Sequence, residues 1–85
     1  MNRRTYIAEQ VDDALDSAYL AHIMEGRDFG AVNWGDLQCT HVDRTGDGWV
    51  VYIEEAAPEC EALRLHVLAW LEKQGVNNVS VVTQW

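Results

Sequence analysis

Apolar residues recur every three or four positions from Tyr6 to about Glu25, which is the spacing of one face of an α-helix. Thr5 has a side chain suited to a helix N-cap, and Gly26 can end the helix in a left-handed conformation. We therefore expect a first helix over residues 6–25, after a loose start at residues 1–4. Its recurring positions are Ile7, Val11, Ala14, Leu15, Ala18, Tyr19, His22 and Ile23.

The helical pattern stops at residues 26–35, where three glycines break any regular period. This segment still carries Phe29, Val32 and Trp34, which are side chains that a solvated linker does not need. We expect an ordered loop that packs against the rest of the domain. Ordered loops often carry functional side chains.

Period-two alternation follows the loop and predicts two strands joined by a hairpin. The first runs over Asp36–Asp43, with Leu37, Cys39 and His41 on one face. Residues 44–48 contain two glycines and suit a tight turn. The second strand runs from Trp49 to Glu55 and is apolar on both faces, which is typical of a central strand.

Residues 56–63 lead from this strand into a second helix, predicted over Glu59–Gln74. Pro58 would lie near the first helical position, where its missing N–H costs nothing. Cys60 would then lie in the first turn. Gly75 ends the helix, and residues 76–85 alternate as a third strand.

This order of elements predicts one domain over residues 1–85 with an αββαβ arrangement. Two helices and three strands can form only two layers, so both helices should cover one face of the sheet. The helical crossover should leave the third strand parallel to the second. The fold class is therefore an α+β two-layer sandwich with a three-stranded mixed sheet.

The chain has 14 acidic residues against 6 Lys and Arg, a formal net charge of −8. Such a chain should repel nucleic acid and anionic membranes, and it should favour basic proteins or cations as partners. The sequence shows neither a signal peptide nor an apolar run of spanning length. We expect a cytoplasmic protein with reduced thiols, monomeric or weakly homodimeric.

Two cysteines are the main candidates for chemistry. The helix dipole should lower the pKa of Cys60, whereas the acids around it should raise it. Cys60 could be a nucleophile, a metal ligand or a buried small apolar residue. Cys39, His41 and Cys60 could form a soft N/S metal site, the alternative being a core Cys and an edge His. His22 and His66 lie on helical stripes, as partly buried residues do.

Several short motifs resemble the small domain of the PaaD/SufT-like proteins of metal–sulfur cluster biosynthesis. These motifs are Asp28-Phe29-Gly30, Asn33-Trp34-Gly35-Asp36-Leu37, Ala57-Pro58-Glu59-Cys60 and the closing strand from Val76 to Trp85. The residues that the family carries around its Pro and Cys are replaced here by Ala56, Ala57 and Glu61. The element order is also similar to the NifU-type scaffold domain, although the first Cys of that domain's pair falls on Ala57.

The resemblance implies an accessory or scaffold protein of iron–sulfur cluster assembly, with Cys60 as its thiol and Asp28 and Asp36 beside it. The cofactor it implies is a transient iron–sulfur cluster or iron. Asp28 and Asp36 could instead only cap turns. No motif of an enzyme with its own cofactor is present.

The alternative is a metal-free acidic protein–protein interaction module that kept this fold and lost the site. A protein partner is expected in either case. Trp is common at the energetic centre of interfaces, and acids suit a basic partner. The candidate partner surface is Trp34, Glu54, Glu55, Glu59 and Glu61.

Overall fold

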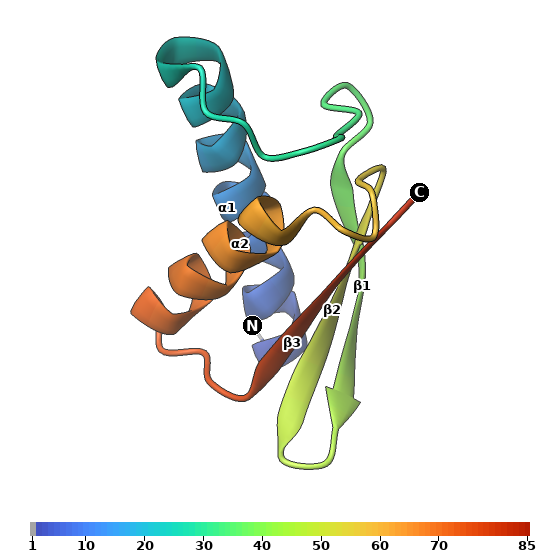
Figure 1. Ribbon diagram of the computed structural model, residues 1–85. Helices are drawn as coiled ribbons and strands as arrows, with labels where there is room; N and C mark the ends of the chain where they lie inside the picture. Colours follow the sequence, from blue (N-terminus) through green and yellow to red (C-terminus); the bar gives the residue numbers. More distant parts are fainter. Residues whose placement is uncertain (1) are drawn as a thin grey trace.

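Two helices and three strands follow one another along the chain in the predicted order (Figure 1). The structure is a computed structural model and describes residues 2–85. The elements are α1 (Arg3–Glu25), β1 (Gln38–Thr45), β2 (Gly48–Glu54), α2 (Glu61–Lys73) and β3 (Val79–Gln84). The predicted α+β class and αββαβ order are confirmed.

The three strands form one mixed sheet in the order β1-β2-β3. β1 and β2 are the antiparallel arms of a hairpin, and β2 pairs with β3 in parallel. β2 is therefore the central strand, as its apolar sequence predicted. The helical crossover through α2 accounts for the parallel pair, because a short turn cannot join parallel neighbours.

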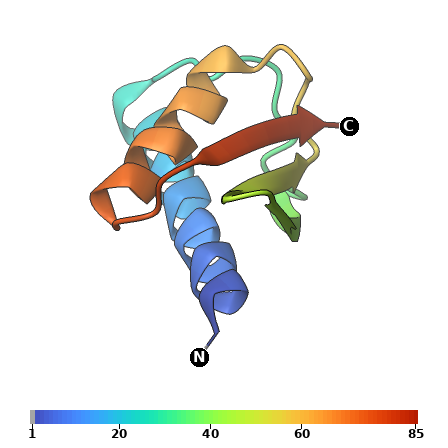
Figure 2. The same cartoon turned by 90° about the horizontal axis from the view of Figure 1, so that it is seen from below.

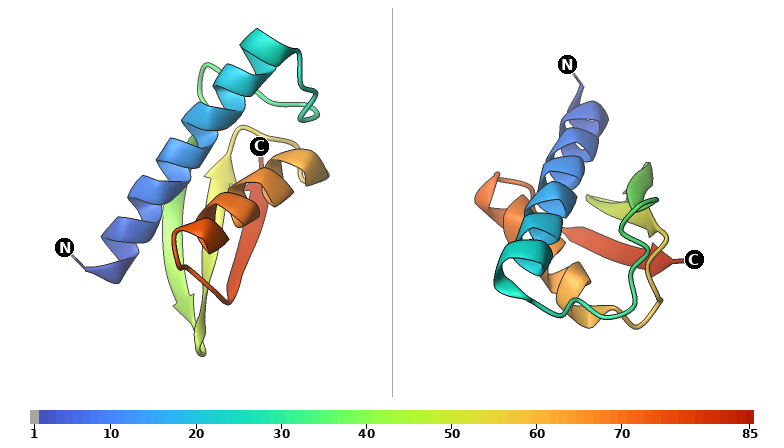
Figure 3. Two further views of the ribbon diagram at one scale, coloured as in Figure 1. Left: turned by 90° about the vertical axis from the view of Figure 1, so that its left-hand side faces the viewer. Right: turned by 90° about the horizontal axis from the view of Figure 1, so that it is seen from above.

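Both helices lie on the same face of the sheet (Figures 2 and 3). The core lies between the two layers. The sheet contributes Val42, Val51 and Ile53, all of them buried. The helices contribute the buried residues Ile7, Val11, Ala14, Leu15, Ala18, Leu63, Val67 and Leu71. No helix within residues 2–85 is long and apolar enough to cross a membrane.

α1 begins three residues earlier than predicted. Asn2 is its N-cap, and the Asn2 side chain accepts a hydrogen bond of 2.8 Å from the Thr5 N–H. Thr5 is therefore inside the helix, and the predicted loose start is wrong for Arg3 and Arg4; Met1 lies outside the described residues. The predicted end is confirmed, because Gly26 is left-handed with φ 70°.

The face of α1 that is buried is narrower than predicted. Tyr19 and Ile23 were expected on the apolar stripe, but they are 45% and 54% exposed. The buried positions are Ile7, Val11, Ala14, Leu15, Ala18 and Ala21. Small residues occupy the last of these positions, where the helix passes beyond the sheet.

α2 begins at Glu61, two residues later than predicted, and Cys60 is its N-cap. The Cys60 N–H donates to the Ala57 carbonyl at 3.0 Å, which closes a four-residue turn. Pro58 occupies the second position of that turn, where its fixed φ is favoured. Pro58 therefore lies in a turn that precedes the helix, and the prediction that it lies near the first helical position is wrong.

The strand boundaries shift for local backbone reasons. The Asp36 N–H bonds to the Asn33 carbonyl in a turn, so β1 starts at Gln38 rather than at Asp36. Glu55 has φ 72°, which ends β2 at Glu54. Asn78 has φ 58°, so β3 starts at Val79 rather than Val76 and ends at Gln84.

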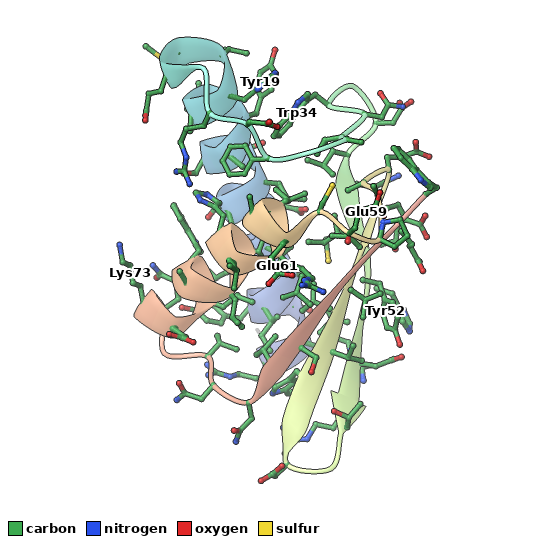
Figure 4. The ribbon with its side chains drawn as sticks, in the orientation of Figure 1. Tyr19, Trp34, Tyr52, Glu59, Glu61 and Lys73 are labelled. Carbon is green, nitrogen blue, oxygen red and sulfur yellow. The ribbon has the colours of Figure 1, made fainter. Side chains whose placement is uncertain are left out.

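β1 contains a register shift that changes which of its side chains share a face. Cys39 lies opposite Ile53, and His41 lies opposite Tyr52, so Thr40 is the extra residue of a β-bulge. Ile53 is in the core, whereas Tyr52 points away from the helices (Figure 4). The prediction that Cys39 and His41 share one face is therefore wrong.

Candidate functional site

Cys60 is covered by the backbone of the loop between α1 and β1. Cys60 is 2% exposed, and its Sγ donates a hydrogen bond to the Ala31 carbonyl at 3.1 Å. A Cβ atom added to Gly30 would lie only 3.1 Å from this Sγ. Gly30 is therefore the residue that lets the loop approach so closely. A thiol that is enclosed and donates a hydrogen bond matches the interpretation of Cys60 as a buried small apolar residue.

The loop is held on Cys60 by backbone pairing with the segment that precedes α2. The Asn33 N–H donates to the Glu55 carbonyl, and the Ala57 N–H donates to the Ala31 carbonyl, both at 2.9 Å. Val32 and Ala56 form an isolated antiparallel bridge between these two bonds. The prediction of an ordered, packed loop is confirmed.

Asp28 and Asp36 lie in this loop and stabilise its turns. Asp28 Oδ1 accepts from the Gly30 N–H at 2.8 Å, and Asp36 Oδ2 accepts from the Asn33 side-chain amide at 3.2 Å. The same Asn33 amide also donates to Glu55 at 3.2 Å. These are the contacts of turn-capping residues. Asp28 bonds to the backbone of Gly30, the residue that lies against Cys60.

Cys39 and His41 point to opposite sides of β1 because of the bulge at Thr40. Burial raises the pKa of the Cys39 thiol, which favours its protonated form. His41 Nε2 lies 2.7 Å from Asp43 Oδ1, and its ring lies 5.8 Å from that of Tyr52, on the face without helices. The structure does not bring Cys39, His41 and Cys60 together as a ligand set.

A metal needs several donors at one place, and a structural site usually has four. Among residues 2–85, no three His, Cys, Asp or Glu side chains are grouped closely enough to hold an ion. Cys60 offers one thiol whose hydrogen bond already points to a carbonyl. An iron–sulfur cluster or iron held within a single chain does not fit these residues.

Trp34 is part of an aromatic cluster that fixes the loop to α1. Its ring stacks on His22 with centroids 4.9 Å apart, and it also contacts Tyr19 at 5.7 Å and Phe29 at 5.8 Å (Figure 4). His22 Nδ1 lies 3.0 Å from the Arg27 carbonyl. Trp34 is half-buried in these contacts, so its role inside the domain is to anchor the loop.

His66 lies between the two helices and the loop. Its ring is edge-on to Phe29 at 5.4 Å, and its Nε2 is buried with no hydrogen-bond partner among the residues that the structure describes. Burial, and after it the Arg27 guanidinium, lowers the pKa of His66. The neutral ring is therefore favoured in the folded protein.

Three of the four glutamates predicted as a partner surface contact other side chains of the chain. Glu54 accepts from Gln84 at 2.9 Å, Glu55 accepts from Asn33, and Glu61 pairs with Arg64. Glu59 is exposed in the turn before α2 (Figure 4). Three of these four carboxylates therefore already have side-chain partners within the chain. Their role as a partner surface stays a prediction.

The sequence reasoning missed the surface at the end of α1. Six large apolar side chains are exposed in the described chain, and four of them lie within six residues of this helix. The α1 ridge, as we call it, consists of Tyr19 (45%), Leu20 (52%), Ile23 (54%) and Met24 (78%). The signal was available, because this many apolar residues cannot all fit on one helical face.

Thr83 also has a structural role that the sequence did not indicate. Its side chain is buried, and its hydroxyl donates to the Ala57 carbonyl at 2.8 Å. This bond ties β3 to the turn below Cys60. Alternation had placed Thr83 on a face of the strand, but it could not identify a partner so distant in sequence.

Comparisons with protein-family models, with curated proteins and with solved structures find no match to this chain. The resemblance to the PaaD/SufT-like proteins therefore stays a prediction that rests on the short motifs and on the element order.

Proposed function

We propose that this protein is an acidic protein–protein interaction module that binds its partner through the exposed side of α1. The α1 ridge carries this proposal. Contiguous exposed apolar side chains often mark an interaction site, and Met adapts its shape to different partners. Binding a partner would remove the four apolar side chains from water.

Acidic residues continue the same side of the helix toward its N-terminus. Asp13 and Asp16 precede Leu20 and Met24 at spacings of three and four, which places them in one row. Burial, and after it the carboxylates of Asp16, Asp13 and Glu9, raises the pKa of Asp12. A partner with apolar side chains followed by Lys or Arg would match both halves of this surface.

The environment of Cys60 also supports an interaction role over thiol chemistry. A reactive thiol is deprotonated and accessible. Cys60 is enclosed, and it donates its proton to Ala31. The module therefore keeps the helix-start Cys as part of its core.

The test is affinity capture of partner proteins by wild type and by the double variant Leu20→Ser, Ile23→Ser. We expect the double variant to lose the partner, and we expect about 0.5 M NaCl to weaken capture because it screens the acidic half. Leu65→Ser is the matched control, since Leu65 and Ile23 are each 54% exposed. Equal capture by wild type and the double variant, with both folded, would refute the proposal.

A second candidate is an accessory role in iron–sulfur cluster assembly, in which the cluster is cargo. It is supported by the position of Cys60 at the start of α2, under a loop that carries Asp28 and Asp36. Such a role requires the Gly30–Ala31 segment to move off the thiol. Iron, sulfide and zinc analysis of anaerobically purified wild type and Cys60→Ser tests it. Metal that depends on Cys60 would support it, and metal-free protein in both cases would exclude it.

A further inference from the structure

β3 forms one edge of the sheet, and α2 lies beside it (Figure 3). Within residues 2–85, β3 pairs with β2 alone. Its other edge therefore has backbone N–H and C=O groups with no strand to receive them. An open edge of this kind can pair with another strand.

The two edges of this sheet differ in how they resist such pairing. β1 carries a bulge at Thr40 and the charged residues Asp43 and Arg44, which are known protections against unwanted strand addition. β3 reads Val-Ser-Val-Val-Thr-Gln and has no charge, proline, glycine or bulge. Only β1 is protected, so β3 is the edge that is suited to pairing.

A groove runs along this open edge between β3 and α2. Leu65 and Leu68 line it from the helix and Val79–Val81 line it from the strand, with a volume of about 320 Å³. Its charged residues are Glu61 and Arg64, which pair with each other. One acid and one base leave the groove neutral, although the whole chain has a charge of −8.

We propose that the open edge of β3 binds the β3 of a second copy of this chain, antiparallel about a two-fold axis. Two copies of charge −8 repel each other, so they can meet closely only where the surface is neutral. This pairing joins the two sheets and places the α2 helices side by side. Leu65 of each copy is then buried, and Glu61 and Arg64 can pair across the axis.

A second copy fits this edge better than a basic partner does. The groove offers no excess negative charge to Lys or Arg, whereas the acidic half of α1 does. The proposed dimer also uses a different surface from the α1 ridge. It is therefore independent of the proposed function, and each proposal can fail without the other.

Sedimentation velocity of the full chain from about 1 µM to about 500 µM tests the dimer, because self-association depends on concentration. Wild type should convert from monomer to dimer. Leu65→Lys should raise the dissociation constant at least about tenfold, since it buries two like charges. Ile23→Lys changes the net charge by the same amount, at a side chain that is also 54% exposed. It should leave the dissociation constant of the dimer within about twofold of the wild-type value.

Hydrogen exchange at low and high concentration locates the contact. In wild type and in Ile23→Lys, the outward amides of β3 should exchange more slowly in the dimer than in the monomer. Ser80→Lys should reduce both the dimer fraction in sedimentation and this protection of the β3 amides. A monomer at every concentration would overturn the proposal. So would a dimer that Ile23→Lys abolishes and Leu65→Lys leaves intact, or β3 amides that exchange equally fast in both states.

Discussion

The contact between Gly30 and Cys60 is the tightest residue-scale feature of the site. Gly30 has φ 94°, and its Cβ would lie 3.1 Å from the Cys60 Sγ. We expect Gly30→Ala to lower the free energy of unfolding by about 1–2 kcal/mol, from the left-handed backbone and from crowding. Urea denaturation measures this loss, and the rate of thiol alkylation should rise because the loop is loosened.

Gly35→Ala is the matched control for that substitution. Its backbone is outside the left-handed region, and its Cβ would meet only the Asn33 Oδ1 at 3.8 Å. Its unfolding free energy should therefore stay within about 0.5 kcal/mol of wild type. Adding Cys60→Ala to Gly30→Ala should recover only that part of the lost unfolding free energy that comes from crowding against the Cys60 Sγ. A fully stable Gly30→Ala would contradict the described loop geometry.

His66 should make the folded protein less stable at acid pH. Its pKa is lowered in the folded state, mainly by burial, so the unfolded chain binds a proton more readily. Stability should therefore fall as the pH drops below about 6.5, the unfolded value. Urea denaturation between neutral pH and pH ~5 should show this slope in wild type and in the exposed control His41→Gln. A slope that persists undiminished in His66→Gln would count against this account.

At the scale of elements, the start of α1 depends on a residue outside its apolar pattern. The Asn2 side chain caps the helix, whereas Thr5 lies within the first turn. We expect Asn2→Ala to cost about 1 kcal/mol of unfolding free energy and Thr5→Ala clearly less. Thermal and urea denaturation of the two variants compare them directly. The reverse order would restore Thr5 as the cap.

The elements themselves were predictable because their hydrophobic periods are long and unambiguous. The start of α2 was not, because Pro58 is favoured both at a first helical position and in a turn. The bulge at Thr40 was also hidden, since alternation assumes one residue opposite one residue. That single extra residue separates Cys39 from His41 and removes the predicted metal site.

At the scale of the whole molecule, the two-layer arrangement follows from the number and order of elements. The sequence predicted that the loop is ordered and packed, but not that it lies over Cys60. It depends on backbone bonds from residues 31 and 33 to residues 57 and 55, which leave no pattern in the sequence. The exposed α1 ridge depends likewise on where the sheet ends beneath the helix. Cys60 was predicted in the first turn of α2 and is its N-cap instead, and its burial could be seen only in the fold.

The net charge of −8 acts on the whole molecule through the crowded acids of α1. Asp12 and Asp16 are one helical turn apart, and the Asp16 carboxylate contributes to the raised pKa of Asp12. We expect Asp16→Asn to stabilise the fold at low salt and Asp16→Lys to stabilise it more, by roughly 0.5–1 kcal/mol. The neutral variant separates loss of repulsion from gain of attraction.

Salt distinguishes this electrostatic effect from a change in packing. At about 1 M NaCl the screening length is about 3 Å, so the three proteins should converge in unfolding free energy. Wild type should gain the most stability from added salt because it keeps the most repulsion. Urea denaturation at low and high NaCl measures both trends. Differences among the three that persist at high salt would mean that Asp16 acts through helix propensity or local contacts instead.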